Sequence, residues 1–194
     1  MFVEDFGHEA VLIPLLRRLA ADRGVQLKLT PRSARGGHGP MLSELEAYLA
    51  DIRAGREKLP DLFVVGTDAN CLGYAERKRQ IEQTCREYAP LTVCAIPDPN
   101  IERWLLLDSG AFKHVLGGGC SPPDMKCQRD RYKQCLTTAV RAAGVQPLLG
   151  GLEYAQDIIE RMDLEHVAIA DTSLGHLVRD FRLRLNQWEG LSID

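Results

Sequence analysis

The sequence has none of the long apolar runs that mark a membrane-spanning protein. Its longest apolar stretches are residues 11–16 and 104–107, far short of the roughly 20 residues that a spanning helix needs. Acids at Glu4 and Asp5 stand where a signal peptide would carry basic residues. We therefore expect a cytoplasmic protein that contacts no membrane and keeps its thiols reduced.

An excess of positive charge is also missing. Lys plus Arg total 24 and Asp plus Glu total 27, so the formal net charge is −3. This excludes a strongly basic nucleic-acid coat protein, but a local basic patch or a bound cation would still allow nucleic-acid binding. What is present is an ordinary globular balance of 45% hydrophobic and 26% charged residues over 194 positions, enough for one domain with a core of its own.

The six cysteines contain no C-x-x-C pair. Cys120, Cys127 and Cys135 with His114 are the candidate zinc set, but their spacings match no common structural zinc site. The plainer interpretation of Cys135 is a small core residue.

Strand-like and helix-like segments alternate through the first half of the chain. Short apolar runs typical of strands lie at 1–3, 25–30, 62–65 and 91–96. Apolar residues at helical spacing lie between them, at 11–23, 42–54 and 74–88. This order predicts an α/β fold with a four-stranded, mostly parallel sheet flanked by helices, with residues 1–97 as its core.

The second half contains helical segments and loops only. Helical spacing occurs at 101–107, 109–116, 129–143, 152–161 and 174–188. We expect residues 98–194 to form a helical extension packed on the core, which gives a single compact domain. The sequence does not set the oligomeric state.

Polar side chains follow three of the predicted strands. They are Glu4 after the first strand, Asp68 and Asn70 after the third, and Asp98 and Glu102 after the fourth. Parallel strands end at one rim, and clustered carboxylates repel one another unless a cation lies among them. Such oxygen ligands favour Mg²⁺ or Mn²⁺, which commonly serve phosphoryl transfer. The plainer alternative for any one acid is a helix cap or a turn.

Two of these strand ends carry a pair of motifs. Residues 2–4 read FVE and residues 64–70 read VVGTDAN. Over residues 1–97 this pairing resembles the Toprim domain of topoisomerases, bacterial primases and OLD-type nucleases. Glu4 matches the motif Glu and Asp68 matches the first Asp of D-x-D, whereas Asn70 stands where the second Asp is expected.

The stretch 68–108 is also similar to small standalone Toprim-like bacterial proteins, which often accompany an ABC- or SMC-type ATPase in phage-defence loci. The resemblance implies a divalent-metal-dependent endonuclease that cleaves DNA or RNA as an effector of anti-phage defence, controlled by such an ATPase. It implies catalytic roles for Glu4 and Asp68, which with Asn70 would hold the metal. Asp98 and Glu102 are further candidate ligands.

Basic side chains suited to a nucleic-acid backbone gather in the loop 31–40, after Asp68, and in the run 126–133. They are Arg32, Arg35, His38, Arg77, Lys126, Arg129 and Lys133. Because the loop 31–40 follows a predicted strand, we expect it at the same rim as Glu4. The alternative for each group is a solvated loop or helix face.

A catalytically degenerate module that binds nucleic acid or a partner is the alternative function. Asn70 supports it, because an amide lacks the charge that the second Asp would bring to a metal. His8 is expected to be an exposed residue at the start of the first helix, with acid–base work or phosphate binding as its alternative. No G-x-S-x-G motif supports a serine hydrolase.

Overall fold

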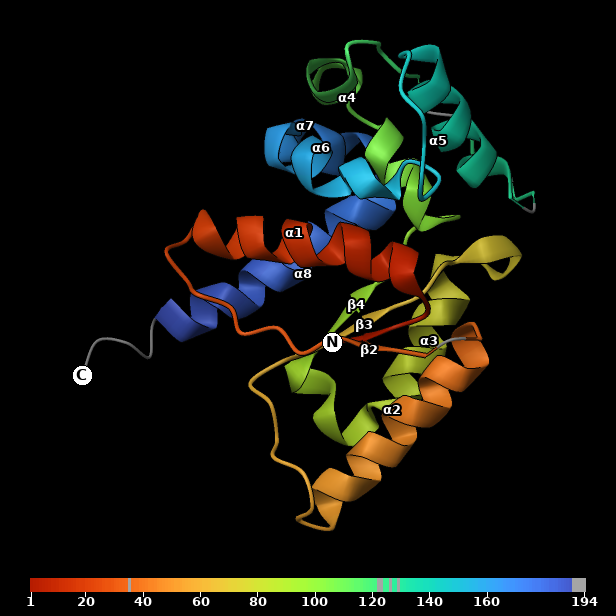
Figure 1. The fold of residues 1–194 in the computed structure, drawn as a ribbon. Helices are drawn as coiled ribbons and strands as arrows, with labels where there is room; N and C mark the ends of the chain where they lie inside the picture. The colour runs from red at the N-terminus through yellow and green to blue at the C-terminus, as the bar shows by residue number, and fades with distance from the viewer. Residues whose placement is uncertain (35, 122–123, 126, 129, 190–194) are drawn as a thin grey trace.

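The centre of the fold is a sheet of four parallel strands in the order β2-β1-β3-β4, shown here in a computed structural model (Figure 1). The strands are β1 (Phe2–Val3), β2 (Arg32–Ser33), β3 (Phe63–Gly66) and β4 (Thr92–Ala95). The structure describes residues 1–34, 36–121, 124–125, 127–128 and 130–189. The predicted α/β fold with a parallel sheet flanked by helices is confirmed.

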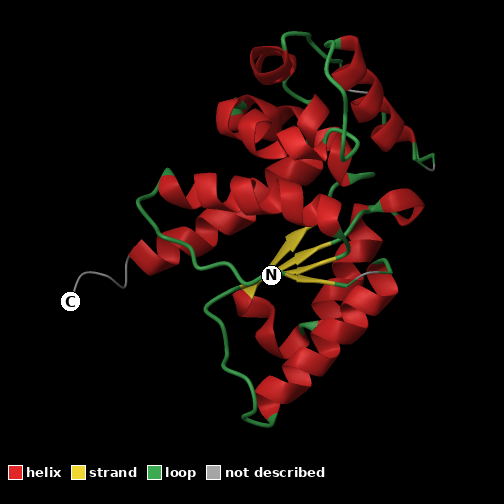
Figure 2. Cartoon of the chain, in the orientation of Figure 1, coloured by secondary structure: helices red, strands yellow, loops and turns green. Residues whose placement is uncertain are grey.

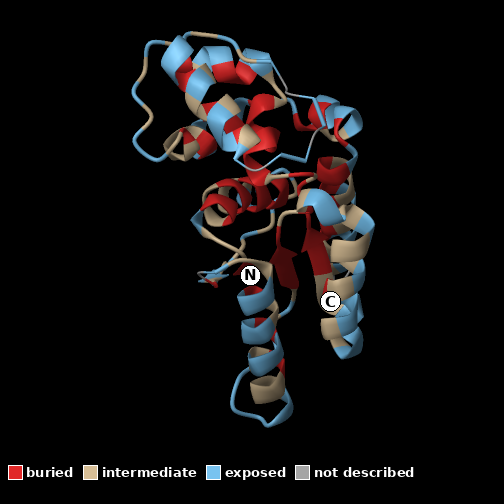
Figure 3. Ribbon diagram, turned by 90° about the vertical axis from the view of Figure 1, so that its right-hand side faces the viewer, coloured by how far each residue is buried: buried red, intermediate tan, exposed pale blue. Residues whose placement is uncertain are grey.

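Helices cover both faces of the sheet (Figure 2). On one face lie α1 (Phe6–Ala21) and α8 (Thr172–Glu189), and on the other lie α2 (His38–Arg53), α3 (Tyr74–Thr84) and the 3₁₀ turn η2 (Arg86–Leu91). Successive side chains of a strand point to opposite faces. Val3 therefore joins the core under α1 and α8, while Phe2 joins the core under α2 and α3. Figure 3 shows the strands buried between these layers.

The remaining helices stack beyond α1. They are α4 (Ser109–Leu116), α5 (Arg131–Ala142), α6 (Ala155–Arg161) and α7 (Leu164–Ala170), with the 3₁₀ turns η3 (Ile101–Leu106) and η4 (Leu152–Tyr154). A further 3₁₀ turn, η1 (Asn70–Leu72), lies in the loop after β3. The buried side chains of the stacked helices, such as Phe112, Leu136 and Ile158, belong to the same core as Leu12 of α1. One hydrophobic core thus draws on both halves of the chain.

The second strand lies later in the chain than predicted. Residues 25–30 alternate between half-buried and exposed, yet they join no ladder, and β2 falls at Arg32–Ser33 inside the predicted loop. A ladder needs a partner, and β1 offers only residues 2 and 3. The helix α7 was not predicted, because its seven residues are too few to show a clear period.

No helix within the described residues combines the length and the apolar character of a membrane span.

Candidate functional site

A cavity of about 290 Å³ opens at the carboxyl ends of the strands. Its lining includes Glu4 and Asp5 after β1, Asp68 and Asn70 after β3, Asn100 and Glu102 after β4, and Tyr132 and Lys133 from α5. Val3 pairs with Gly66, which pairs with Ala95, so the three strands end level with one another. The ladder register therefore brings polar groups from distant parts of the chain to one place.

Glu4 is held at this cavity by the residues that follow β3. Its Oε2 accepts hydrogen bonds from Thr67 Oγ1 at 2.6 Å and from the Asp68 backbone N–H at 3.1 Å. His38 Nδ1 lies 3.0 Å from the same hydroxyl oxygen. The hydroxyl proton goes to Glu4, so His38 donates to Thr67. Burial and the charge of Arg77 lower the pKa of His38, which favours this neutral, donating form.

Asp68 accepts hydrogen bonds on both carboxylate oxygens. Its Oδ1 accepts from the Ile101 backbone N–H at 2.9 Å, and its Oδ2 accepts from Asn100 Nδ2 at 2.7 Å. The same Asn100 amide donates to Asn70 Oδ1 at 3.1 Å. Asn100 thus fixes both side chains of the D-x-N sequence after β3.

His8 lies buried beneath the cavity, with none of its surface exposed. Its Nδ1 is 2.8 Å from Asp5 Oδ1, and its Nε2 is 3.2 Å from Asp68 Oδ1 without hydrogen-bond geometry. Burial alone would lower the pKa of His8, but the Asp68 charge and the Asp5 hydrogen bond outweigh it and raise that pKa to about 10. His8 is therefore a buried cation between two carboxylates, which corrects the prediction of an exposed histidine.

Glu102 is a buried acid with one distant cationic partner. Its side chain is only 5% exposed, and its nearest cation is Lys133, whose Nζ lies 4.0 Å from Oε1. Burial, followed by the charge of Asp68, raises the pKa of Glu102 to about 7. By contrast, the hydrogen bond from His8 is the main cause that lowers the pKa of Asp5 to about 2. A negative charge on Glu102 is therefore disfavoured beside Asp68 unless a further cation enters the cavity.

A disulfide joins Cys71 to Cys127, and both cysteines line the cavity. This bond overturns the expectation that all thiols are reduced. It also removes Cys127 from the candidate zinc set. Cys71 directly follows Asn70, so the bond fastens the segment after α4 to the loop that carries Asp68.

Two predicted site residues lie elsewhere. The Asp98 backbone N–H donates to Ser173 Oγ at 3.2 Å, and Asp98 does not line the cavity. Arg32 lies at the opposite end of the sheet, because β2 begins at this residue instead of ending before it. Its guanidinium stands 4.5 Å from the ring centroid of Tyr48 and 3.4 Å from Glu57. The predicted place of Arg32 at the acidic rim is therefore wrong, and Asp98, although it follows β4, lies outside the cavity.

Three of the remaining basic residues, Arg77, Lys133 and His38, lie near the acids. Arg77 Nε donates to the Asp68 carbonyl oxygen at 3.1 Å, so this side chain braces the loop after β3. Lys133 lines the cavity and His38 stands behind Glu4, so both are near the acids. Arg35, Lys126 and Arg129 lie outside the described residues.

The oxygen donors of Glu4, Asp68, Asn70 and Glu102 are of the chemical type that binds a hard divalent cation. Carboxylate and amide oxygens are the ligands that Mg²⁺ prefers, and a cation would oppose the burial and the Asp68 charge that raise the pKa of Glu102. Within the described residues, no three His, Cys, Asp or Glu side chains already form a metal cluster. Mg²⁺ often takes one or two carboxylates and fills its shell with water and substrate phosphate. Asp68 and Glu102 would then be its protein ligands, beside Glu4 and Asn70.

Comparison of the chain with protein-family models, with curated proteins and with solved structures finds no match.

Sequence reasoning missed the residues that hold the acids in place. Asn100 sits in the predicted loop after the fourth strand, where an amide side chain carries no periodic signal. His8 and Asp5 were visible as a pair three positions apart at a helix start. An Asp at the N-cap followed by a buried face would have indicated that His8 turns inward.

Proposed function

We propose that the protein is a divalent-metal-dependent nuclease that hydrolyses phosphodiester bonds of DNA or RNA. The observation that carries the proposal is the convergence of Glu4, Asp68 and Glu102 on one cavity, with the pKa of Glu102 raised to about 7 by burial and by Asp68. The site gathers more carboxylates than cations, because among the described residues Glu4, Asp5, Asp68 and Glu102 face only His8 and Lys133, and such an excess of negative charge is suited to a bound metal ion.

The protein's own groups would do the following work. Asp68, fixed by Asn100 and Ile101, and the nearby Glu102 would hold the ion against a phosphodiester oxygen. A divalent ion supplies Lewis-acid polarisation of the phosphoryl group and lowers the pKa of a bound water. Glu4 lies beside them and would accept the proton of the attacking water, since its Oε1 is not used by Thr67 or Asp68.

Positive groups near the cavity would orient the substrate. Lys133 lines the cavity and faces Glu102 from α5. Its ammonium can contact a phosphate once the ion neutralises Glu102. The cavity of about 290 Å³ has room for a phosphodiester group beside the acids.

The role in anti-phage defence and the control by an ABC- or SMC-type ATPase remain part of this proposal. They rest on the resemblance of the Glu4 and Asp68 motifs to the Toprim domain. In cells, we expect Asp68→Asn to abolish protection against phage while the protein is still produced.

A second candidate function is a catalytically degenerate module that binds nucleic acid or a partner. The observation that favours it is that both Asp68 oxygens already accept hydrogen bonds, from Ile101 and Asn100. Asn70 adds no charge to the site. In this case the carboxylates would have a structural role.

A cleavage assay separates the two functions. The substrates are supercoiled plasmid, single-stranded DNA and total tRNA, each with Mg²⁺ or Mn²⁺ and with EDTA. We expect metal-dependent cleavage that Asp68→Asn and Glu4→Gln each reduce at least about 100-fold. Asp61→Asn is the matched control, because this acid is exposed and lies at the other end of the sheet.

Cleavage that survives both substitutions would contradict the proposed site. Absence of cleavage, together with Mn²⁺ binding that calorimetry finds unchanged in Asp68→Asn, would favour the binding module. Absence of cleavage with Asp68-dependent Mn²⁺ binding would point to a nuclease that needs its ATPase partner.

A further inference from the structure

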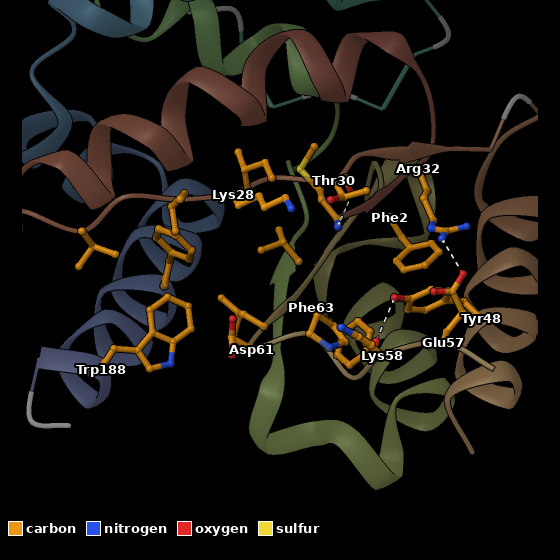
Figure 4. A pocket seen from close by; sticks show the side chains of 18 of the residues that line it. Phe2, Lys28, Thr30, Arg32, Tyr48, Glu57, Lys58, Asp61, Phe63 and Trp188 are labelled. Carbon is orange, nitrogen blue, oxygen red and sulfur yellow. Dashed lines mark hydrogen bonds and ion pairs between the residues drawn. The ribbon is translucent and has the colours of Figure 1, made fainter. Parts of the chain in front are cut away.

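A second and larger cavity, of about 940 Å³, lies at the amino end of the sheet. Figure 4 shows it between α8 and α2, with Trp188 on one side and Tyr48 on the other. Two stretches of chain form its long walls, residues 25–30 before β2 and residues 60–64 leading into β3. The acidic cavity is at the opposite end of the strands, so this is a separate place on the molecule.

The cavity lies in line with the central strand. Phe2 of β1 pairs with Arg32 of β2 on one side and with Val65 of β3 on the other. The two flanking walls continue beyond Met1, whose amino group donates to the Thr30 carbonyl oxygen at 3.0 Å. Two neighbouring strand spacings sum to roughly 9–10 Å. Walls that keep this spacing beyond Met1 would leave room for one strand, and we call this part of the cavity the strand slot.

Backbone groups on both walls face the strand slot. Arg32 N and Ala34 N donate to the carbonyl oxygens of Met1 and Val3, so even-numbered residues of β2 face the line of β1. Thr30 continues this arrangement, because its carbonyl oxygen accepts from the Met1 amino group, and an extended backbone with a period of two would turn the N–H groups of Thr30 and Lys28 to the same side. None of the N–H groups of residues 26–30 donates a hydrogen bond within the described part of the chain.

The wall before β3 repeats this arrangement. Gly66 presents its carbonyl oxygen to Glu4 N, so the even-numbered residues of β3 face the line of β1. By the same period Leu62 faces the strand slot, and its N–H has no hydrogen-bond partner among the described residues. An occupant that satisfies both walls must offer donors and acceptors on two opposite edges, which is what an extended peptide does.

The two faces of the strand slot differ in chemistry. One face is apolar, with Leu27, Leu29 and Leu62 packed against the core that contains Phe181. The other face carries the rings of Tyr48 and Phe63. A peptide in the slot would therefore bury alternate side chains on the apolar face and present the others to the aromatic rings and the rim.

The rim of the strand slot has more cations than anions. Four cationic side chains and two acidic ones line the cavity; they are Lys28, Arg32, Arg56, Lys58, Glu57 and Asp61. Arg32 pairs with Glu57, and Arg56 pairs with Asp51. Lys28 and Lys58 form no ion pair within the described residues. Acidic side chains on the occupant would meet these two lysines.

We propose that the strand slot is a docking site for an extended acidic peptide of a partner protein, which adds itself to the sheet in line with β1. Main-chain hydrogen bonds to Thr30 and Leu62 provide affinity. Apolar residues at alternate positions and acidic residues between them provide specificity. This site is independent of the metal chemistry at the opposite end of the sheet.

Binding of synthetic peptides tests the proposal. The probe is the fluorescein-labelled, amidated peptide Glu-Ile-Glu-Ile-Ser, titrated into the full chain up to about 1 mM. We expect binding that is at least about tenfold weaker for the scrambled peptide Ile-Ile-Glu-Glu-Ser and for the charge-reversed peptide Lys-Ile-Lys-Ile-Ser. Thr30→Pro, which removes the donor N–H, should weaken binding about tenfold, whereas Thr30→Val keeps the N–H and should not.

Hydrogen–deuterium exchange supplies a readout that does not depend on affinity alone. The Glu-Ile-Glu-Ile-Ser peptide should slow exchange of the amides in residues 26–30 and 61–62 and leave the loop at Asp68 unchanged. Equal binding of the scrambled peptide, unchanged binding to Thr30→Pro, or no binding up to the highest concentration would each overturn the proposal. Slow amide exchange in both walls before any peptide is added would also overturn it, because another part of this chain would then already occupy the slot.

Discussion

His8 and Glu102 are both buried beside Asp68, but burial has opposite consequences for them. His8 is paired on both ring nitrogens by carboxylates, so it carries a positive charge at neutral pH. Glu102 is 5% exposed and has only Lys133 at 4.0 Å, so its ionised form is disfavoured. The folded protein therefore accommodates the histidine charge and resists the glutamate charge.

The first prediction at this scale concerns Glu102→Gln. The pKa of Glu102 is raised from 4.5 to about 7 in the folded state, so the folded protein binds this proton more tightly than the unfolded chain does. The penalty is absent below pH 4.5, grows as the pH rises toward 7, and is complete above it. Glu102→Gln removes the penalty, and at pH 8 the variant should be more stable by up to about 3 kcal/mol.

Urea unfolding in EDTA at pH 4 and pH 8 measures this effect. The two proteins should have the same free energy of unfolding at pH 4 and should differ at pH 8. Adding Mg²⁺ at pH 8 should stabilise the wild type more than Glu102→Gln, because the ion compensates the ionised carboxylate. A loss of stability that is equal at both pH values would show that Glu102 is instead held by contacts that its charge does not disturb.

At the scale of elements, the sequence predicted three strands of the sheet and misplaced the edge strand β2. The apolar runs 62–65 and 91–96 are uninterrupted, so β4 falls within its predicted range and β3 is shifted from its own by one residue, to Phe63–Gly66. Residues 25–30 alternate as a strand would, but β1 is too short to pair with them. The length of the partner strand β1, which is a property of the tertiary structure, therefore determines where β2 forms.

The candidate site shows the same division. Glu4 and Asp68 were accessible from the sequence, because parallel strands end at one rim and both follow apolar runs. Asn100, which fixes Asp68, sits in a loop whose course depends on the packing of η3. Asp98, two residues before Asn100, is the opposite case. It was predicted as a site residue, but its backbone N–H donates to Ser173 Oγ.

A prediction about elements concerns the contact between α7 and α8. Gly175 lies in the first turns of α8, and a Cβ at this position would stand 2.4 Å from the Ala168 carbonyl oxygen of α7. Because that neighbour is backbone, Gly175→Ala should force the two helices apart and cost about 1–3 kcal/mol. Gly39→Ala, in the first turn of α2, meets no atom within 4 Å and serves as the control.

Thermal and urea unfolding of both variants measure the difference. Gly39→Ala should be neutral or slightly stabilising, since Ala favours a helix more than Gly does. If Gly175→Ala matched Gly39→Ala, the close approach of α7 and α8 would have to relax without cost, and the packing described for these helices would be wrong.

At the scale of the whole molecule, the disulfide joins parts of the chain that the sheet alone does not connect. Cys71 follows the strand-end loop of β3, and Cys127 belongs to the segment between α4 and α5. The helices of the second half share a core with α1, whereas η1 belongs to the first half of the chain. The bond thus fastens the wall of the cavity from both halves of the chain.

The last prediction is the stability that this bond provides. The cysteines are 56 positions apart, and the loss of loop-closure entropy in the unfolded chain corresponds to about 4 kcal/mol for a loop of this length. Cys71→Ser and Cys127→Ser should each lose most of that free energy of unfolding in urea without reductant. The double variant should lose no more than either single one, because all three break the same bond. Additive losses would mean that the two side chains stabilise the protein separately, and the covalent link between the halves would then be wrong.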